Sequence, residues 1–225
     1  MALPEELLKK QALAKEEFSW FEPQTTPLFQ EDLYTHIVEN SGAGKGIVEV
    51  GCYTGGMTLI LGHIASMLGW PLYVIDVHQP FLDQTKQAME KFNPGAEATY
   101  CLGDLAAFTQ QIMLQVRPNL IFIDASHEYH SALNDIKCIY KMNKMPYFAA
   151  FHDFGLKSLP TSSQEINVGR AIHESWGQDL SYKGAGVFAV ERSPVNEYGH
   201  YFEAGLHEGI IVDLSKQVLS SHVEQ

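Results

Sequence analysis

Short apolar runs alternate with longer segments along this chain of 225 residues, and the longer segments repeat apolar positions at helical spacing. The short runs predict five β-strands, at residues 46–50, 72–77, 98–102, 120–124 and 147–151. The segments between them predict helices at residues 58–68, 83–92, 106–116 and 131–142. Strands separated by helices form right-handed crossovers, so we expect an α/β fold with a doubly wound, mostly parallel sheet.

Both ends of the chain extend this central pattern. Helical spacing predicts two N-terminal helices at residues 4–17 and 26–40, and two further strands at residues 180–183 and 187–192 flank Gly184-Ala185-Gly186. A glycine-rich turn between two strands predicts a C-terminal antiparallel hairpin, which would bring the sheet to seven strands. We therefore divide the chain into an N-terminal helical appendage at residues 1–29, a central α/β domain at residues 30–192 and a C-terminal arm at residues 193–225.

Three segments outside the regular pattern could border a binding site. Phe18, Trp20 and Phe21 form an aromatic cluster that either covers a pocket or packs on the domain or on a dimer partner. Residues 155–167 predict a loop that closes over a substrate. Residues 198–207, rich in Tyr, His and Phe, are interpreted either as a substrate lid or as an arm packed on a neighbouring subunit.

The stretch from Ile47 to Thr58, with the sequence IVEVGCYTGGMT, contains an apolar strand, an acidic residue and a glycine-bearing turn that leads into a helix. Glycines at such a turn let the backbone fold sharply and approach a ligand closely. The first turn of the following helix leaves N–H groups free to donate. This segment therefore predicts a ligand-binding turn.

Acidic residues stand at or just beyond the end of each predicted strand of the central pattern: Glu49, Asp76, Asp104, Asp124 and Asp153. In open α/β sheets, ligands bind outside the carboxyl ends of the strands, so we expect these carboxylates to surround one crevice. Aspartate in this position is also a common helix N-cap, and two or three of the five could have that role instead.

Composition and charge narrow the classes of partner. The formal net charge of -12 argues against nucleic acid, whose phosphates bind clustered Lys and Arg. We expect no membrane partner and a cytoplasmic location, because no apolar run approaches the length of a membrane span and acidic residues occur where a signal peptide would be basic. The three cysteines are odd in number and widely spaced, which predicts free thiols.

The identity of the ligand follows partly by exclusion. Tyr53 stands where a dinucleotide motif requires its second glycine, and no Lys follows Gly55 as a Walker loop requires. Glu49 before the turn suits a ligand with a cationic amino-acid end, and Asp76 suits paired ribose hydroxyls.

Over roughly residues 30–192, the chain resembles the class I S-adenosylmethionine-dependent methyltransferases. The run Glu49-Val50-Gly51-Cys52-Tyr53-Thr54-Gly55 is similar to the family's first motif, Asp76 to its ribose-binding acid, and residues 103–105 to its adenine segment. The resemblance implies a cofactor site made by Glu49, Gly51, Cys52, Tyr53, Gly55, Thr58, Asp76, Val77, Asp104, Leu105 and Asp124.

Within that family, Asp124-Ala125-Ser126-His127 resembles the Asp-x-x-His segment of small metal-dependent O-methyltransferases that act on macrolide sugars and other natural products, and more distantly the catechol type. DNA and amide N-methyltransferases carry a proline-rich motif in its place. The resemblance implies a metal site of Asp124, His152 and Asp153, although His152-Asp153 departs from the Asp-Asn and acidic-Asp pairs known at that position.

Methyl transfer from a sulfonium requires the enzyme to place the acceptor, exclude water and deprotonate a hydroxyl. A histidine base or a divalent metal can assist the deprotonation. We assign catalytic roles to His127, as general base, and to Asp124. His127 could instead be a helix cap or a histidine that only orients a neighbour, and His152 could merely orient Asp153. Two carboxylates favour Mg²⁺ or Mn²⁺, and a ligating His152 favours Mn²⁺ or another transition metal.

These observations favour an S-adenosylmethionine-dependent O-methyltransferase acting on a small hydroxylated metabolite. Two alternatives stay open. The first is a metal-dependent oxygenase or hydrolase that uses His127, His152 and Asp153, which would leave Asp76 unexplained. The second is a catalytically idle cofactor-binding module. A homodimer is also left open.

Overall fold

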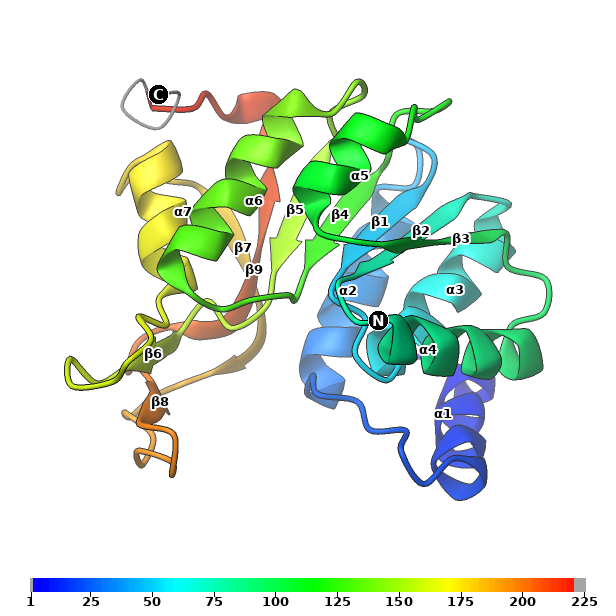
Figure 1. Ribbon diagram of the computed structural model, residues 1–225, viewed down its shortest axis with the longest axis horizontal. Helices are drawn as coiled ribbons and strands as arrows, with labels where there is room; N and C mark the ends of the chain where they lie inside the picture. Colours follow the sequence, from blue (N-terminus) through cyan, green and yellow to red (C-terminus); the bar gives the residue numbers. More distant parts are fainter. Residues whose placement is uncertain (1, 221–225) are drawn as a thin grey trace.

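A seven-stranded sheet forms the centre of the computed structural model, which describes residues 2–220 (Figure 1). Its strand order is β3-β2-β1-β4-β5-β9-β7, with parallel pairing from β3 to β5 and antiparallel pairing of β9 with both neighbours. The strands are β1 Ile47–Val50, β2 Leu72–Asp76, β3 Ala98–Leu102, β4 Leu120–Ile123, β5 Phe148–Phe151, β7 Tyr182–Phe188 and β9 His207–Asp213. The predicted doubly wound, mostly parallel sheet is confirmed.

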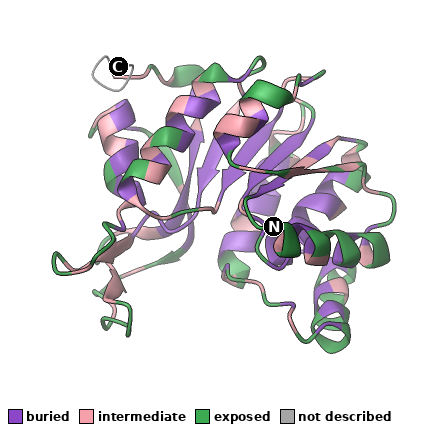
Figure 2. Cartoon of the chain, viewed as in Figure 1, coloured by how far each residue is buried: buried purple, intermediate pink, exposed green. Residues whose placement is uncertain are grey.

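Helices cover both faces of the sheet, whose strands are largely buried (Figure 2). One apolar cluster joins the sheet to α1 Glu5–Glu17, α2 Pro27–Glu39, α3 Gly56–Leu68 and α4 Gln79–Phe92. A second cluster joins the opposite face to α5 Leu105–Gln111, α6 Tyr129–Lys141 and α7 Val168–Trp176. The short 3₁₀ helix η1, Leu214–Lys216, follows β9. None of the helices in residues 2–220 is long and apolar enough to cross a membrane.

The helices differ from the predictions at three places. The helix expected at residues 83–92 is α4, which already begins at Gln79. The helix expected at residues 106–116 is α5, which ends at Gln111 because Ile112 adopts an extended conformation as its C-cap. The helix α7 was not predicted. The sequence contains signals for it, because Asn167 is a residue type that favours the N-cap position and the apolar residues that follow have helical spacing. In the structure the Asn167 side chain accepts a hydrogen bond from the N–H of Arg170 at 3.1 Å.

The predicted hairpin turn at Gly184–Gly186 is wrong, because β7 continues through these residues and pairs with β9. Small residues serve here for close packing, since a Cβ at Gly184 would lie 2.3 Å from the His207 ring. Gly186, at φ 76°, lies at an irregularity in the pairing of β7 with β9. The antiparallel partner strand β9 comes from beyond residue 192, within the expected C-terminal arm.

A two-stranded antiparallel sheet stands apart from the main sheet, at the lower left of Figure 1. Its strands are β6, Leu156–Ser158, and β8, His200–Phe202, which come from the two segments interpreted as loop and lid. The N-terminal aromatic cluster packs on the domain: the Phe18 ring stacks on Trp20 at 4.7 Å between centroids and meets Phe92 of α4 at 6.1 Å.

Candidate functional site

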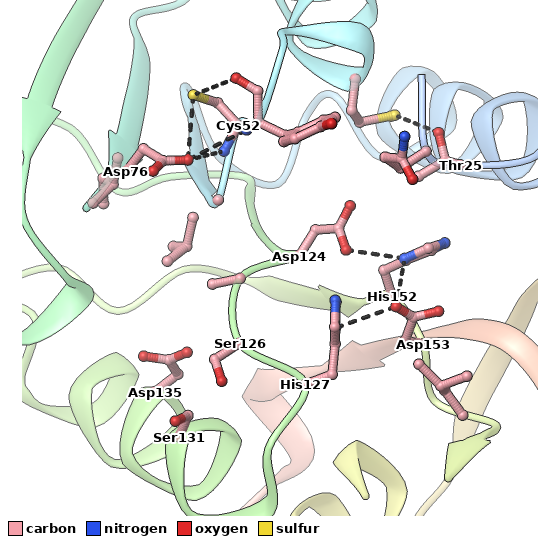
Figure 3. A pocket seen from close by; sticks show the side chains of 18 of the residues that line it. Thr25, Cys52, Asp76, Asp124, Ser126, His127, Ser131, Asp135, His152 and Asp153 are labelled. Atoms are coloured by element: carbon pink, nitrogen blue, oxygen red, sulfur yellow. Dashed lines mark hydrogen bonds and ion pairs between the residues drawn. The ribbon is translucent and has the colours of Figure 1, made fainter. Parts of the chain in front are cut away.

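A cavity of about 1350 Å³ lies at the carboxyl ends of the parallel strands (Figure 3). We call the turns after β1, β2 and β3 its donor side, because the predicted methyl donor would bind there. We call the residues after β4 and β5, together with Glu208, its acceptor side, where the predicted methyl acceptor would bind. The predicted cofactor residues that line the cavity are Gly51, Cys52, Tyr53, Asp76, Val77, Asp104, Leu105 and Asp124. The other three, Glu49, Gly55 and Thr58, do not line it.

The glycine turn after β1 brings the backbone close to β4. Gly51 has φ 84°, and a Cβ there would lie 2.3 Å from the carbonyl oxygen of Asp124. Only glycine fits both the conformation and the space. The backbone of Tyr53 also has a left-handed conformation, with φ 45°, and Tyr53 lines the cavity. The turn therefore presents bare backbone to a ligand.

Asp76, at the end of β2, organises the donor side. Its Oδ2 accepts hydrogen bonds from the N–H groups of Cys52 at 3.0 Å and Tyr53 at 3.3 Å, and its Oδ1 accepts one from the N–H of His78 at 2.8 Å. The carboxylate is buried, lines the cavity and joins two consecutive β–α turns. Its predicted role as the ribose-binding acid stays a prediction.

Glu49 departs from the expectation that five carboxylates surround one crevice. Successive residues of a strand point to opposite faces. Glu49 thus shares the face of Ile47, which packs in the cluster with α3. Its carboxylate oxygens and the Thr58 hydroxyl are buried without hydrogen-bond partners among the described residues. Burial raises the pKa of Glu49 to about 8.

Asp104 has the role of a helix cap as well as a place in the cavity. Its Oδ1 accepts a hydrogen bond from the N–H of Ala107 at 2.7 Å, which makes it the N-cap of α5. Its side chain also lines the cavity next to Leu105. Both interpretations left open for the strand-end aspartates therefore apply to this one residue.

The acceptor side brings together all the predicted catalytic and metal-binding residues (Figure 3). The Nδ1 atom of His152 lies 2.9 Å from Asp124 Oδ1 and 3.4 Å from Asp153 Oδ2. His127 Nδ1 lies 3.2 Å from the same Asp153 oxygen. His127 is one-third exposed, whereas the side chains of His152 and Asp153 are mostly buried.

Backbone strain marks the acceptor side too. Asp153 has φ 54°. Asp153 and Tyr53 are the two non-glycine residues with positive φ among residues 2–220. Both line the cavity. Such a conformation costs about 1–3 kcal/mol and persists where the surrounding structure over-determines it, commonly at functional sites. The strained backbone directs the Asp153 carboxylate toward the two histidines.

Glu208, on β9, is a site residue that sequence reasoning missed. Its Oε1 lies 3.1 Å from His152 Nε2 and its carboxylate is buried in the cavity wall. One sequence signal could have indicated it. Glu208 is an acidic residue directly before Gly209-Ile210-Ile211-Val212, a run typical of a buried strand. The residue lies within the expected C-terminal arm, for which the sequence analysis predicts no strand.

The charges of this cluster stabilise one another. Burial would lower the pKa of His152, but the three neighbouring carboxylates together raise the pKa of this ring well above its ordinary value. Burial would raise the pKa of Asp153, yet the rings of His152 and His127 hold it below the ordinary value. Hydrogen bonds from His152 and Thr26 likewise outweigh burial and lower the pKa of Glu208.

Asp124, His152 and Asp153 form a group that could hold a metal ion. One ligand atom from each lies within 4.8 Å of the others. Glu208 lies at Nε2 of His152, so Nδ1 is the nitrogen that faces the two aspartates. Two carboxylate oxygens and one imidazole nitrogen suit Mn²⁺ or another transition metal better than Mg²⁺. The residues present therefore fit a metal.

The whole cavity has an acidic lining. Seven carboxylates line it, and no Lys or Arg of the described residues does. The carboxylates are Glu22, Asp76, Asp104, Asp124, Asp135, Asp153 and Glu208. Burial and the neighbouring Asp104 raise the pKa of Asp135 to about 7, so part of this charge is neutralised at physiological pH. Sites for phosphate or carboxylate ligands use Arg, Lys or bare N–H groups, and among the described residues neither Arg nor Lys lines this cavity.

Known proteins resemble this chain in both sequence and structure. Residues 48–154 match the model of a methyltransferase domain family. No curated protein matches the chain. The O-methyltransferase from Bacillus cereus, solved in complex with SAH, is 17% identical, with 92% of this chain and 87% of that chain covered and a TM-score of 0.58.

Two further solved structures share the fold. The O-methyltransferase TomG from Streptomyces achromogenes, involved in tomaymycin synthesis and solved with SAM, is 12% identical, with 94% of this chain and 90% of that chain covered and a TM-score of 0.56. The SAH-bound methyltransferase PaMTH1 from Podospora anserina is 14% identical with a TM-score of 0.53. The match covers 68% of this chain and spans 64% of the length of PaMTH1.

Proposed function

We propose that this chain, of which residues 48–154 match a methyltransferase domain family, is an S-adenosylmethionine-dependent enzyme that methylates a hydroxyl group of a small, uncharged or cationic metabolite. The family match over residues 48–154 supports the predicted enzyme class, and the solved structures that share its fold include O-methyltransferases. The oxygen acceptor, the metal and the histidine base belong to the proposal.

One observation carries the proposal: the Asp124, His127, His152 and Asp153 cluster opens into the same cavity as the glycine turn and Asp76. S-adenosylmethionine, when bound, supplies a methyl group on a positively charged sulfur that needs no further activation. The chain must therefore hold the acceptor oxygen in line with that methyl and remove its proton.

His127 is the base in this proposal. Its Nδ1 faces Asp153 Oδ2 at 3.2 Å, so an Nδ1–H donating to that carboxylate leaves the Nε2 lone pair to accept a proton. The acceptor oxygen forms its bond to the methyl carbon as the carbon–sulfur bond breaks, and the hydroxyl proton moves to Nε2. Asp153 stabilises the resulting imidazolium, as a carboxylate does beside a catalytic histidine.

Asp124, His152 and Asp153 would hold a divalent metal, which would supply Lewis-acid assistance to the deprotonation of a hydroxyl. Asp124 lies between the two sides, because its carbonyl oxygen meets the glycine turn and its carboxylate meets His152. This residue therefore fixes the distance between the cofactor site and the acceptor site.

The charge of the cavity supports the class of acceptor. An anionic acceptor such as a phosphorylated sugar or a coenzyme A thioester would meet a carboxylate-rich wall without a Lys or Arg partner among the described residues. Beyond Asp153 the wall is made by Leu156, Val187, Ala189 and Phe202, which suit an apolar part of a neutral metabolite. The free thiols of Cys52, Cys101 and Cys138 support a reducing compartment such as the cytoplasm.

Two measurements test this proposal. Calorimetry with S-adenosylmethionine should show binding, and its absence would end the methyltransferase assignment. Methyl transfer is then measured with neutral phenols and glycosides and with their phosphorylated counterparts. We expect at least roughly tenfold lower kcat/KM for the phosphorylated member of each pair, because like charges in a binding site cost several kcal/mol. Equal turnover of both members would contradict the acceptor class.

Chelation tests the metal. Activity should disappear in EDTA and return when Mn²⁺ is added in excess, with Mg²⁺ less effective. Activity that is indifferent to EDTA would remove the metal from the mechanism while leaving the methyl transfer and the His127 base intact.

A further inference from the structure

The His152 ring is held at both of its nitrogen atoms. Nδ1 faces Asp124 and Asp153, and Nε2 faces Glu208 Oε1 at 3.1 Å. The Phe29 ring packs against it at 5.1 Å between centroids, with the planes at 72°. These contacts fix the plane of the imidazole as well as its position.

Glu208 is itself held by two other segments of the chain. Its Oε1 accepts a hydrogen bond from the N–H of Thr26 at 2.9 Å, and its Oε2 accepts one from the N–H of Val187 at 3.1 Å and one from the Thr26 hydroxyl. A Cβ at Gly186 would lie 2.3 Å from Oε2, so the backbone of β7 closes on the carboxylate. The side chain is 6% exposed.

This arrangement decides which nitrogen of His152 can bind a metal. A carboxylate that accepts the Nε2–H keeps a proton on that atom, so Nδ1, which faces Asp124 and Asp153, is the nitrogen that a metal between the two aspartates would bind. Metal-binding histidines commonly donate their other N–H to such a carboxylate, and loss of that partner costs about 10–100-fold in metal affinity or activity.

We propose that Glu208 is the positioning residue of the metal site: it sets the tautomer and orientation of His152 and links them to the Thr26 segment and to β7. This inference rests on the proposed metal-assisted function. Glu208 does not touch the acceptor or the metal in this account and acts only through His152.

Replacement of Glu208 by Gln tests the tautomer directly. The amide cannot accept from all the surrounding donors, because its NH₂ group would face an N–H of Thr26 or Val187. Glu208→Asp keeps the buried charge but shortens the side chain by one methylene, which withdraws it from Nε2. Glu203→Gln is the matched control, since Glu203 lies on the surface and pairs with Lys157 at 3.6 Å.

The affinity for Mn²⁺ is measured by the electron paramagnetic resonance signal of free Mn²⁺, and the affinity for S-adenosylmethionine by calorimetry. We expect Glu208→Gln and Glu208→Asp to weaken Mn²⁺ binding about 10–100-fold. S-adenosylmethionine affinity should stay within about twofold, which shows that the variants are folded, and Glu203→Gln should match the wild type. If Glu208→Gln does not fold, Glu208→Asp decides.

The outcomes separate the two proposals. Unchanged Mn²⁺ affinity in a folded Glu208 variant, with the wild type binding Mn²⁺, overturns the positioning role and leaves the proposed function intact. A wild-type protein that binds no Mn²⁺ and keeps its activity in EDTA overturns the metal, and the role of Glu208 with it.

Discussion

The two sides of the cavity differ in how far along the chain their partners lie. On the donor side, Asp76 accepts from the N–H of Cys52, only 24 residues earlier. On the acceptor side, Glu208 pairs with His152 across 56 residues and with Thr26 across 182. The donor side is thus made by consecutive β–α turns, whereas the acceptor side adds to the residues after β4 and β5, where Asp124 and His152 lie 28 residues apart, a carboxylate from a distant strand. Changes on one side should leave ligand binding on the other side intact.

The largest expected effect is on the acceptor side. His127→Ala removes the base and should lower kcat about 10²–10⁴-fold. Because His127 has no role in the donor side, S-adenosylmethionine affinity should be unchanged. Steady-state kinetics and calorimetry measure the two quantities, with His63→Ala on α3, outside the cavity, as the matched control. Unchanged turnover would contradict the base role.

Beneath the donor side, Glu49 should make stability depend on pH. Its folded pKa of about 8 lies above its ordinary value of 4.5, so the folded protein holds a proton that the unfolded chain releases. Stability present below pH 4.5 is therefore lost as pH rises toward 8, by about 5 kcal/mol.

Glu49→Gln should remove this loss. Urea unfolding at several values between pH 5 and pH 9 measures this loss. The free energy of unfolding of the variant should rise relative to that of the wild type as the pH rises. The exposed Glu97→Gln is the control and should follow the wild type. Parallel curves for wild type and Glu49→Gln would show that Glu49 ionises freely in the folded protein.

Asp76→Asn tests the donor side itself. An amide accepts more weakly than a carboxylate, and its NH₂ group would oppose the N–H donors of Cys52, Tyr53 or His78. The loss of charge-assisted hydrogen bonds should weaken S-adenosylmethionine binding by about 2 kcal/mol, or roughly 30-fold. Calorimetry measures this affinity, and Mn²⁺ affinity should not change. The exposed Asp83→Asn on α4 is the control. A matching loss of Mn²⁺ affinity would show that the two sides are not independent.

The smallest effect is expected at Asp104. Asp104→Ala removes the N-cap of α5 and should cost about 1 kcal/mol of unfolding free energy, measured in urea. Asp104→Ser restores a capping oxygen and should recover that stability. If S-adenosylmethionine binds Asp104→Ser as weakly as Asp104→Ala, the carboxylate has a ligand role beyond the cap.

The difference between the two sides also explains what could be predicted from sequence. Strand ends and glycine turns are local signals, and they placed Gly51, Asp76 and Asp104 in the cavity. They also brought together Asp124 and Asp153, because parallel strands place their carboxyl ends at one edge. The alternation of strand residues could have excluded Glu49 from the crevice, since it shares a face with Ile47.

Residues joined only by tertiary contacts escaped prediction. Gly184-Ala185-Gly186 has the composition of a turn, and nothing nearby in the sequence indicates that β7 continues through it to pair with β9. The same contact makes the small side chains necessary, because the His207 ring and the Glu208 carboxylate fill the space. Once that pairing was missed, Glu208 was missed with it.

The place of β9 between β5 and β7 has a consequence for synthesis on the ribosome. Every donor-side turn has been made when the chain reaches residue 105, and the N–H groups that bind Asp76 are then already present. His152 must wait for residues 207–213, about a hundred residues of synthesis after the donor side, before it meets Glu208. A nascent chain can therefore form its cofactor turn well before its catalytic side, and it becomes an enzyme only when one of its last strands inserts between two earlier ones.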